Sequence, residues 1–202
     1  MSDNLPSRRS RMPVVATVFI FSVFAAAAYL STKAPDVQRA EVRAGPPDVL
    51  KSPADIEAYA GKLRAHLEQQ PDDARSWVLL ARMQAELERF PQATQAYEKA
   101  LALPSKVARD PLVWCEYADA LGMAQGGKLA GKPRELIARA LALDAHHPKA
   151  LEMAGSAAYE QGNFEETLRY WRPLLATLGA GSREHRELTD AIARTERLAA
   201  AK

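Results

Sequence analysis

Two glycines and a lysine in the middle of the chain have the spacing of half a phosphate-binding loop. Gly126, Gly131 and Lys132 fit G-x4-G-K, a loop whose backbone N–H groups surround nucleotide phosphates. The next residue is Pro133, where that loop needs the Ser or Thr hydroxyl that holds magnesium. The segment also follows an expected helix, whereas the motif requires a strand before it. We therefore interpret these residues as an extended turn between helices, with a nucleotide hydrolase as the enzyme-class alternative.

The histidines and the single cysteine offer little metal or thiol chemistry. His146 and His147 are adjacent and no third ligand lies at zinc-binding spacing, so we expect them in a loop. Cys115 alone excludes an internal disulfide framework, and without C-x-x-C-H the chain does not attach haem covalently. Its neighbours Glu116 and Asp119 disfavour a thiolate, so we expect an inert, partly accessible thiol. The sequence predicts no enzyme, no metal site and no cofactor.

These residues lie within a helical unit that occurs three times. The tetratricopeptide repeat (TPR) is a helical hairpin with the pattern W-x2-L-G-x2-Y, A-x3-F and a final proline over about 34 residues. Units begin at Ala74, Pro111 and Pro148, which are 37 residues apart each time (111 minus 74 and 148 minus 111). Each interval therefore carries three residues beyond the bare repeat. The predicted repeats are about 74–107, 111–147 and 148–181.

Three tryptophans occupy large-residue positions of the repeat. Trp77 and Trp114 stand at its tryptophan position and Trp171 at its aromatic position, so we expect all three in the core. Small residues such as Gly155 let the paired helices approach. The alternative, an aromatic platform for haem, is not favoured.

Helices are expected on both sides of the repeats. Ser52 and Pro53 form an N-cap and first helical position, and the helix that follows ends before Pro71, which makes a half-repeat. After the last repeat, Ser182 caps a final amphipathic helix that covers the end of the solenoid. The fold prediction is all-α, with eight helices and no strand, over residues 53–200.

The N-terminal quarter of the chain has a different composition. Residues 1–11 are polar and basic, residues 12–30 contain no charge and are long enough to span a bilayer, and residues 31–52 form a flexible linker. The preceding arginines keep the N-terminus cytoplasmic by the positive-inside rule and place the repeats across the membrane. The length of the apolar run favours an uncleaved single-pass anchor. A signal peptide cleaved near residues 26–28 is the alternative.

The charge of the chain argues against nucleic acid as a partner. The formal charge is +2, but residues 1–33 hold four basic and one acidic side chain, which leaves 23 basic and 24 acidic residues for the rest (27 minus 4 and 25 minus 1). A near-neutral domain binds phosphate backbones poorly. A protein or peptide partner is the better expectation.

In the repeat family, ligand contacts come mostly from positions 2, 5, 9, 12 and 13 of each first helix, on the concave face of the solenoid. On this register the candidate peptide-binding residues are Arg75, Val78, Arg82, Glu86, Asp119, Met123, Lys149, Glu152, Ser156 and Tyr159. The same positions include Ala85, Leu112, Cys115, Gly122 and Glu160. Such a lining suits an amphipathic helix, with the apolar residues in contact and the charges setting its register. For any single residue, a solvated helix face is the alternative.

The second unit carries a more specific signal. From Tyr117 to Ala158 the sequence follows the string YADAL-AQGG-L-G-P-LI-RALALD-HPKAL-AG-AA. This string resembles the periplasmic repeat domain of c-type cytochrome biogenesis proteins, the CcmI/CycH/NrfG family, and the resemblance covers roughly residues 53–200. Long members of that family have two membrane segments, whereas one is expected here.

The resemblance implies a chaperone anchored in the bacterial inner membrane with its repeats in the periplasm. It would bind apocytochrome c, through a C-terminal helical segment, and present it to the other maturation and haem lyase components. The binding-class alternative is a general periplasmic scaffold for envelope or secretion complexes, which would share the anchor and the groove but not this string.

Overall fold

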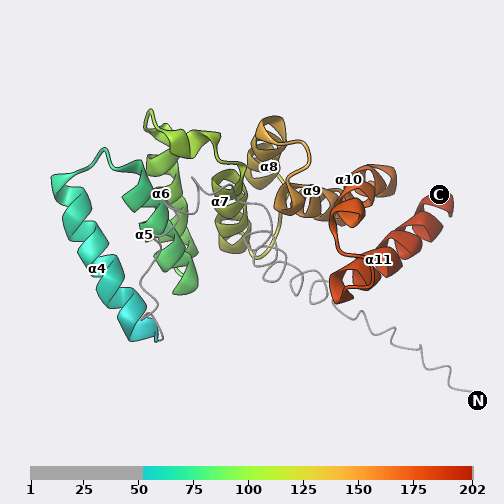
Figure 1. Ribbon diagram of the computed structural model, residues 1–202, viewed down its shortest axis with the longest axis horizontal. Coiled ribbons are helices and arrows are strands. Elements are labelled where there is room, and N and C mark those ends of the chain that lie inside the picture. The colour runs from blue at the N-terminus through green and yellow to red at the C-terminus, as the bar shows by residue number, and fades with distance from the viewer. Residues whose placement is uncertain (1–51, 202) are drawn as a thin grey trace, which may run out of the picture.

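The computed structural model describes residues 52–201, and the fold of this part is a curved stack of helices with no strand. Eight α-helices and one 3₁₀ helix follow one another along the stack in chain order, and Figure 1 shows the two end helices bending toward the same side. The elements are α4 (Pro53–Gln69), α5 (Ala74–Glu86), α6 (Phe90–Ala102), η1 (Lys106–Arg109), α7 (Pro111–Ala124), α8 (Lys132–Leu143), α9 (Pro148–Glu160), α10 (Phe164–Thr177) and α11 (Arg183–Ala200).

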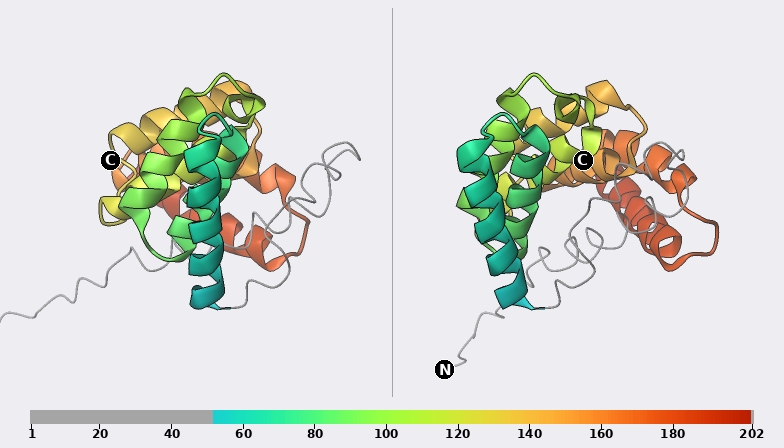
Figure 2. Two further views of the ribbon diagram at one scale, coloured as in Figure 1. Left: turned by 90° about the vertical axis from the view of Figure 1, so that its left-hand side faces the viewer. Right: turned by 60° about the vertical axis from the view of Figure 1, so that its left-hand side comes forward.

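Three antiparallel pairs, α5–α6, α7–α8 and α9–α10, are the three predicted repeats. Each pair packs tightly on itself, and the second helix of one pair contacts the first helix of the next. Figure 2 shows the same succession from two further sides. The all-helical, repeat-based fold predicted from the sequence is confirmed for these residues.

Both flanking helices begin where the sequence predicts. The Ser52 hydroxyl accepts the Asp55 backbone N–H and the Asp55 carboxylate accepts the Ser52 N–H, a reciprocal capping box that starts α4. The Ser182 hydroxyl accepts the His185 N–H at the start of α11. One face of α11 buries Leu188 and Ile192 against α10, so this helix closes the end of the core.

The extra residues of the two intervals lie in different places. The turn within repeat 1 occupies 87–89 and that within repeat 3 occupies 161–163, but the turn within repeat 2 runs from 125 to 131. The first interval instead carries its extra residues between repeats, where η1 forms. An equal spacing of 37 residues therefore hides two different insertions.

The tryptophans are unequal in burial. Trp171 is buried, whereas Trp77 and Trp114 are only partly buried, so the prediction that all three are core residues is right in full for Trp171 alone. The Trp77 indole N–H donates to the Pro71 carbonyl oxygen at 2.8 Å, and that of Trp114 donates to the Ala108 carbonyl oxygen at 2.9 Å. Each ring thus ties the segment preceding its repeat to that repeat, because its N–H needs a partner at the edge of the core.

At Gly155 the two helices of repeat 3 approach each other closely. A Cβ built on Gly155 would lie 2.1 Å from Nε1 and 2.2 Å from Cδ1 of Trp171, a separation that no side chain can occupy. The absence of a Cβ therefore lets the indole ring of Trp171 on α10 contact the backbone of α9.

The predicted membrane anchor and linker lie outside the described residues. Within residues 52–201, no helix combines the length and the apolar character needed to cross a bilayer.

Candidate functional site

The first helices of the repeats, α5, α7 and α9, present the predicted ligand-binding positions, and we call the surface that these positions form the inner face. Helix α7 contacts α9 directly, in addition to its partner α8. The candidate residues on it differ in exposure: Arg75 and Glu86 are exposed, Arg82, Asp119, Met123, Lys149 and Tyr159 are intermediate, and Val78, Glu152 and Ser156 are buried.

At the first junction, between repeats 1 and 2, the charged groups are paired. Nε of Arg82 on α5 donates to both carboxylate oxygens of Glu116 on α7, at 3.1 and 3.0 Å. The Tyr97 hydroxyl lies 3.4 Å from the same carboxylate. Burial is the largest influence on Glu116 and raises its pKa, while the Arg82 guanidinium opposes that rise. Arg82 therefore holds two repeats together and is less available to a ligand than the sequence suggests.

Sequence reasoning missed Glu116 as a partner. Arg82 and Glu116 are 34 residues apart, the length of one bare repeat, and they carry opposite charges. That combination of spacing and charge is the signal that would have found the pair.

At the second junction, between repeats 2 and 3, the charged groups are poorly paired. Lys149 Nζ lies 3.8 Å from Glu152 Oε2, close enough for a Coulombic interaction but too far for a hydrogen bond. Glu152 is 8% exposed, and Oε2 has no hydrogen-bond partner within the described part of the chain. Burial raises the pKa of Glu152, Lys149 lowers it, and Asp119 on α7 raises it further.

Tyr159 is packed inside repeat 3 more than the groove prediction implies. Its ring stacks on Trp171 with 5.7 Å between centroids and 22° between planes, and it lies 5.7 Å from the Phe164 ring. Removing this side chain would therefore disturb the core as well as any bound ligand.

The thiol of Cys115 is fully buried, so the prediction of a partly accessible thiol is wrong. Its Sγ lies 4.0 Å from Nδ1 of His147, and burial raises the pKa of the thiol to about 12. His147 is the N-cap residue of α9, and its Nδ1 accepts the Ala150 N–H at 3.4 Å. Burial lowers the pKa of His147. Both groups are neutral at physiological pH, and the arrangement offers no reactive thiolate.

The glycine-containing segment is a turn between two helices, as expected, and not a phosphate loop. Gly126 and Gly131 have φ values of +74° and +75°, and Lys132 is the first residue of α8. The backbone N–H of Leu129 in this turn donates to Glu160 Oε2 at 3.2 Å, which uses that carboxylate to hold the loop. The nucleotide hydrolase alternative has no structural support in residues 52–201, because the required strand is absent there.

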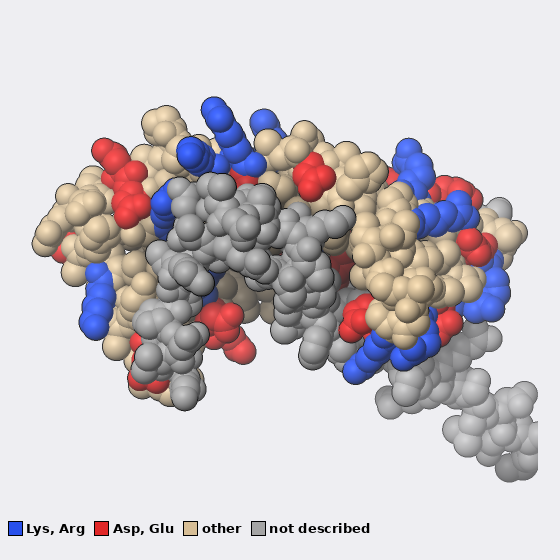
Figure 3. Space-filling view, viewed as in Figure 1, with Lys and Arg blue, Asp and Glu red and all other residues tan. Residues whose placement is uncertain are grey.

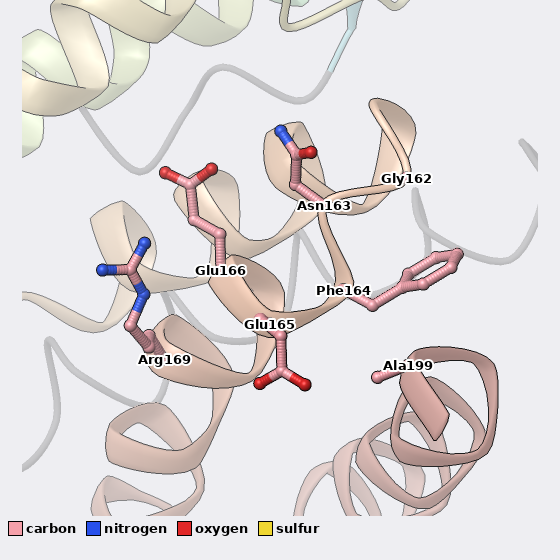
Figure 4. A pocket seen from close by; sticks show the side chains of 7 residues that line it. All are labelled: Gly162, Asn163, Phe164, Glu165, Glu166, Arg169 and Ala199. Carbon is pink, nitrogen blue, oxygen red and sulfur yellow. The ribbon is translucent and has the colours of Figure 1, made fainter. Parts of the chain in front are cut away.

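Within residues 52–201, charges of both signs are mixed over the face in view, and the depression beside α11 lies apart from the candidate binding residues. Figure 3 shows acidic and basic side chains mixed over the face turned to the viewer, without a large patch of one sign. A depression of about 390 Å³ lies between the α9–α10 turn and the end of α11, lined by residues 162–166, Arg169 and Ala199 (Figure 4). None of the candidate binding residues lines it.

Comparison with known proteins places the chain in a family. The sequence profile described as "Cytochrome c-type biogenesis protein H TPR domain" matches residues 37–185. The chain belongs to this family. The resemblance inferred from the 117–158 string is thereby confirmed.

Related proteins are found in several bacteria. Cytochrome c-type biogenesis protein CycH of Bradyrhizobium diazoefficiens is 31% identical over 121 residues, which cover 60% of this chain and 32% of the relative. CycH of Pseudomonas aeruginosa is 29% identical over 128 residues, which cover 63% of this chain and 31% of the relative. The formate-dependent nitrite reductase complex subunit NrfG of Escherichia coli O157:H7 is 25% identical over 60% of this chain and 58% of its own length. The chain thus matches about a third of the length of the CycH relatives.

A solved structure supports the fold alone. The crystal structure of MamA protein superposes with a TM-score of 0.57 at 14% sequence identity, covering 72% of this chain and 81% of that chain. Such a likeness without sequence similarity agrees with the helical-repeat architecture.

Proposed function

We propose that this chain is a TPR adaptor of cytochrome c maturation that binds apocytochrome c and presents it for haem attachment. The bound segment is a C-terminal helix of the apocytochrome, which lies along the inner face. The observation that carries the proposal is the family match over residues 37–185, which includes all three repeats.

The inner face supports this proposal by its chemistry. The exposed and partly exposed positions combine apolar side chains such as Met123 with charges of both signs, among them Arg75 and Asp119. An amphipathic helix places apolar and charged residues along one groove in the same way, and a flexible methionine adapts to its shape. A nucleotide or metal substrate would need a different lining.

The test is a titration of the full chain with fluorescently labelled C-terminal peptides of apocytochrome c. Met123→Lys introduces an ammonium group on the inner face, and we expect it to weaken binding at least tenfold because an apolar contact is lost and the new charge must be desolvated. Leu143→Lys is the matched control: Leu143 is a 45% exposed apolar residue on α8, outside the predicted groove. This variant should bind as the wild type does.

Equal affinity of all three proteins, with each shown to be folded by circular dichroism, would remove the inner face as the client site. Preference for unrelated unfolded proteins over apocytochrome peptides would instead favour a general periplasmic scaffold.

The proposal extends to location. Residues 12–30 act as a single-pass anchor in the inner membrane, with the N-terminus in the cytoplasm and the repeats in the periplasm, where the other haem lyase components are met. Alkaline phosphatase fused after Lys202 is active only in the periplasm, and we expect it to be active in whole cells. Fluorescence of a cytoplasm-dependent reporter at the same position, with inactive phosphatase, would contradict this topology.

A further inference from the structure

The two junctions between repeats carry opposite charges at one register position of the first helices. Arg82 in repeat 1 and Asp119 in repeat 2 occupy the same register position, because 82 plus 37 is 119. At the first junction this position supplies the guanidinium that binds Glu116. At the second junction the same position carries a carboxylate, so the cation of the first junction has no counterpart there.

The second junction nevertheless contains a buried acceptor. Glu152 is 8% exposed and its Oε2 lacks a hydrogen-bond partner within residues 52–201. A buried carboxylate oxygen without a donor is unfavourable unless something completes it. Lys149 is the nearest cation of the described chain, and at 3.8 Å it does not provide that hydrogen bond.

The charged groups around Glu152 have a net negative charge. Asp119 on α7 and Glu152 on α9 provide two carboxylates, and Lys149 provides one ammonium group. Asp119 makes no hydrogen bond or ion pair with any other side chain between residues 52 and 201. One further positive group between α7 and α9 would balance the junction and give Glu152 Oε2 its donor.

We propose that this positive group comes from the bound polypeptide, as the side chain of one lysine or arginine held between Asp119 and Glu152. The partner's cation would thus act on Glu152 as Arg82 acts on Glu116, although Glu152 lies one residue before the register position of Glu116 (116 plus 37 is 153). The inference rests on the proposed function, since it assigns the chemistry of the ligand that the inner face binds.

A metal ion suits the place less well. No group of three or more His, Cys, Asp or Glu residues that could hold a metal occurs in the described part of the chain, and hard cations require more oxygen ligands than two carboxylates provide. A long, flexible cationic side chain requires only one or two acceptors and reaches a partly buried site through its apolar stem.

The experiment combines variants of the protein with variants of the peptide. C-terminal apocytochrome c peptides, each with one lysine or arginine replaced by methionine, are titrated against the full chain by fluorescence anisotropy. Against the wild type, one of these replacements should weaken binding about tenfold, because a charge-assisted hydrogen bond is lost. Against Glu152→Gln the same replacement should weaken binding less than twofold. Glu98→Gln, which changes an exposed carboxylate on α6 outside the inner face, is the matched control and should retain the tenfold difference.

The outcomes distinguish failure of the cation site from failure of the proposed function. If the peptides bind but no single cation is coupled to Glu152, the cation site is refuted while the proposed function stands. If no apocytochrome peptide binds the wild type, the proposed function fails and the site fails with it.

A purely structural role for Glu152 predicts something else, namely that Glu152→Gln lowers the thermal midpoint of unfolding. We expect no such decrease, because the substitution removes an unsatisfied buried charge. Should Glu152→Gln fail to fold, Asp119→Asn provides the test. In this variant, replacing the same peptide cation by methionine should also weaken binding less than it does in the wild type. Absence of that coupling would overturn the inference.

Discussion

The two junctions between repeats have opposite electrostatics at the same register position of the first helices. At the first, Nε of Arg82 on α5 donates to both carboxylate oxygens of Glu116 on α7. At the second, Asp119 and Glu152 are both acidic, and Oε2 of Glu152 has no hydrogen-bond donor within residues 52–201. The first junction is therefore held by its own ion pair, whereas we propose that the second is completed by a cation of the bound polypeptide.

The largest expected effect tests whether repeat 3 holds the second junction rigidly. Position 8 of the first helix is Ala81, Ala118 and Gly155 in the three repeats. Gly155→Ala should destabilise the chain by about 3 kcal/mol, because the new Cβ would overlap the Trp171 indole. Chemical denaturation measures this change. Ala118→Gly, the reverse substitution in repeat 2, should lose about 2 kcal/mol, through helix propensity and the removal of a fully buried methyl group. Equal small losses would mean that Gly155 and Trp171 do not pack as described.

The next largest effect is expected from a substitution that removes the ion pair of the first junction. Arg82→Met removes the guanidinium and leaves the Glu116 carboxylate without its main partner, which should lower the free energy of unfolding by about 2 kcal/mol. A double variant, Arg82→Met with Glu116→Leu, should recover part of this loss because no unpaired charge then remains. Urea denaturation of the three proteins gives both numbers. No recovery in the double variant would show that packing, and not the charge pair, joins repeats 1 and 2.

The same kind of change at the second junction should have the opposite sign. Glu152→Gln should raise the free energy of unfolding at pH 7 by about 1 kcal/mol, since it removes an unsatisfied buried charge. Burial raises the pKa of Glu152 above its ordinary value of 4.5, so the folded state binds this proton more tightly than the unfolded state. The stabilising effect of that proton is full below pH 4.5 and is lost as the pH rises. The advantage of the variant should therefore shrink toward pH 4, and an advantage that grows toward pH 4 would contradict the assignment.

The smallest effect compares the turns on either side of the junctions. Glu88 in repeat 1 has φ of +56°, whereas repeat 3 has Gly162 with φ of +70° in the corresponding turn. Glu88→Gly should stabilise the chain by about 0.5 kcal/mol, because a left-handed conformation is strained for a residue with a side chain and this gain exceeds the added entropy of the unfolded glycine. The thermal midpoint should rise by a few degrees at most. A decrease would indicate that the Glu88 side chain has a stabilising contact.

The sequence predicts the helices well because repeat periodicity and caps are local signals. Ser52 and Ser182 are N-cap residues that mark the start of α4 and α11, and the 37-residue spacing locates the three helical pairs. The spacing does not reveal that the extra residues form η1 in one interval and a long turn in the other, since both give the same sum. Local sequence also gives no measure of how deeply a ring lies, so the partial exposure of Trp114 was not foreseen.

The candidate site was predictable as a set of positions but not as a set of roles. Register placed Arg82, Asp119 and Glu152 on one face. Whether a charge there is free or paired depends on the neighbouring repeat, and only the structure shows that Arg82 is bound to Glu116 while Glu152 Oε2 is not satisfied within residues 52–201.

Asp119→Arg tests the contrast between the junctions most directly, because it places in repeat 2 the residue that repeat 1 has at the same position. The measurement is the affinity of a labelled C-terminal apocytochrome c peptide for the wild type and for this variant, together with the thermal midpoint of each protein. We predict a higher midpoint, since Glu152 gains an internal donor, and a loss of affinity of tenfold or more, since that donor takes the place of the partner's cation. A variant that binds the peptide as tightly as the wild type, with an unchanged or lower midpoint, would contradict the account.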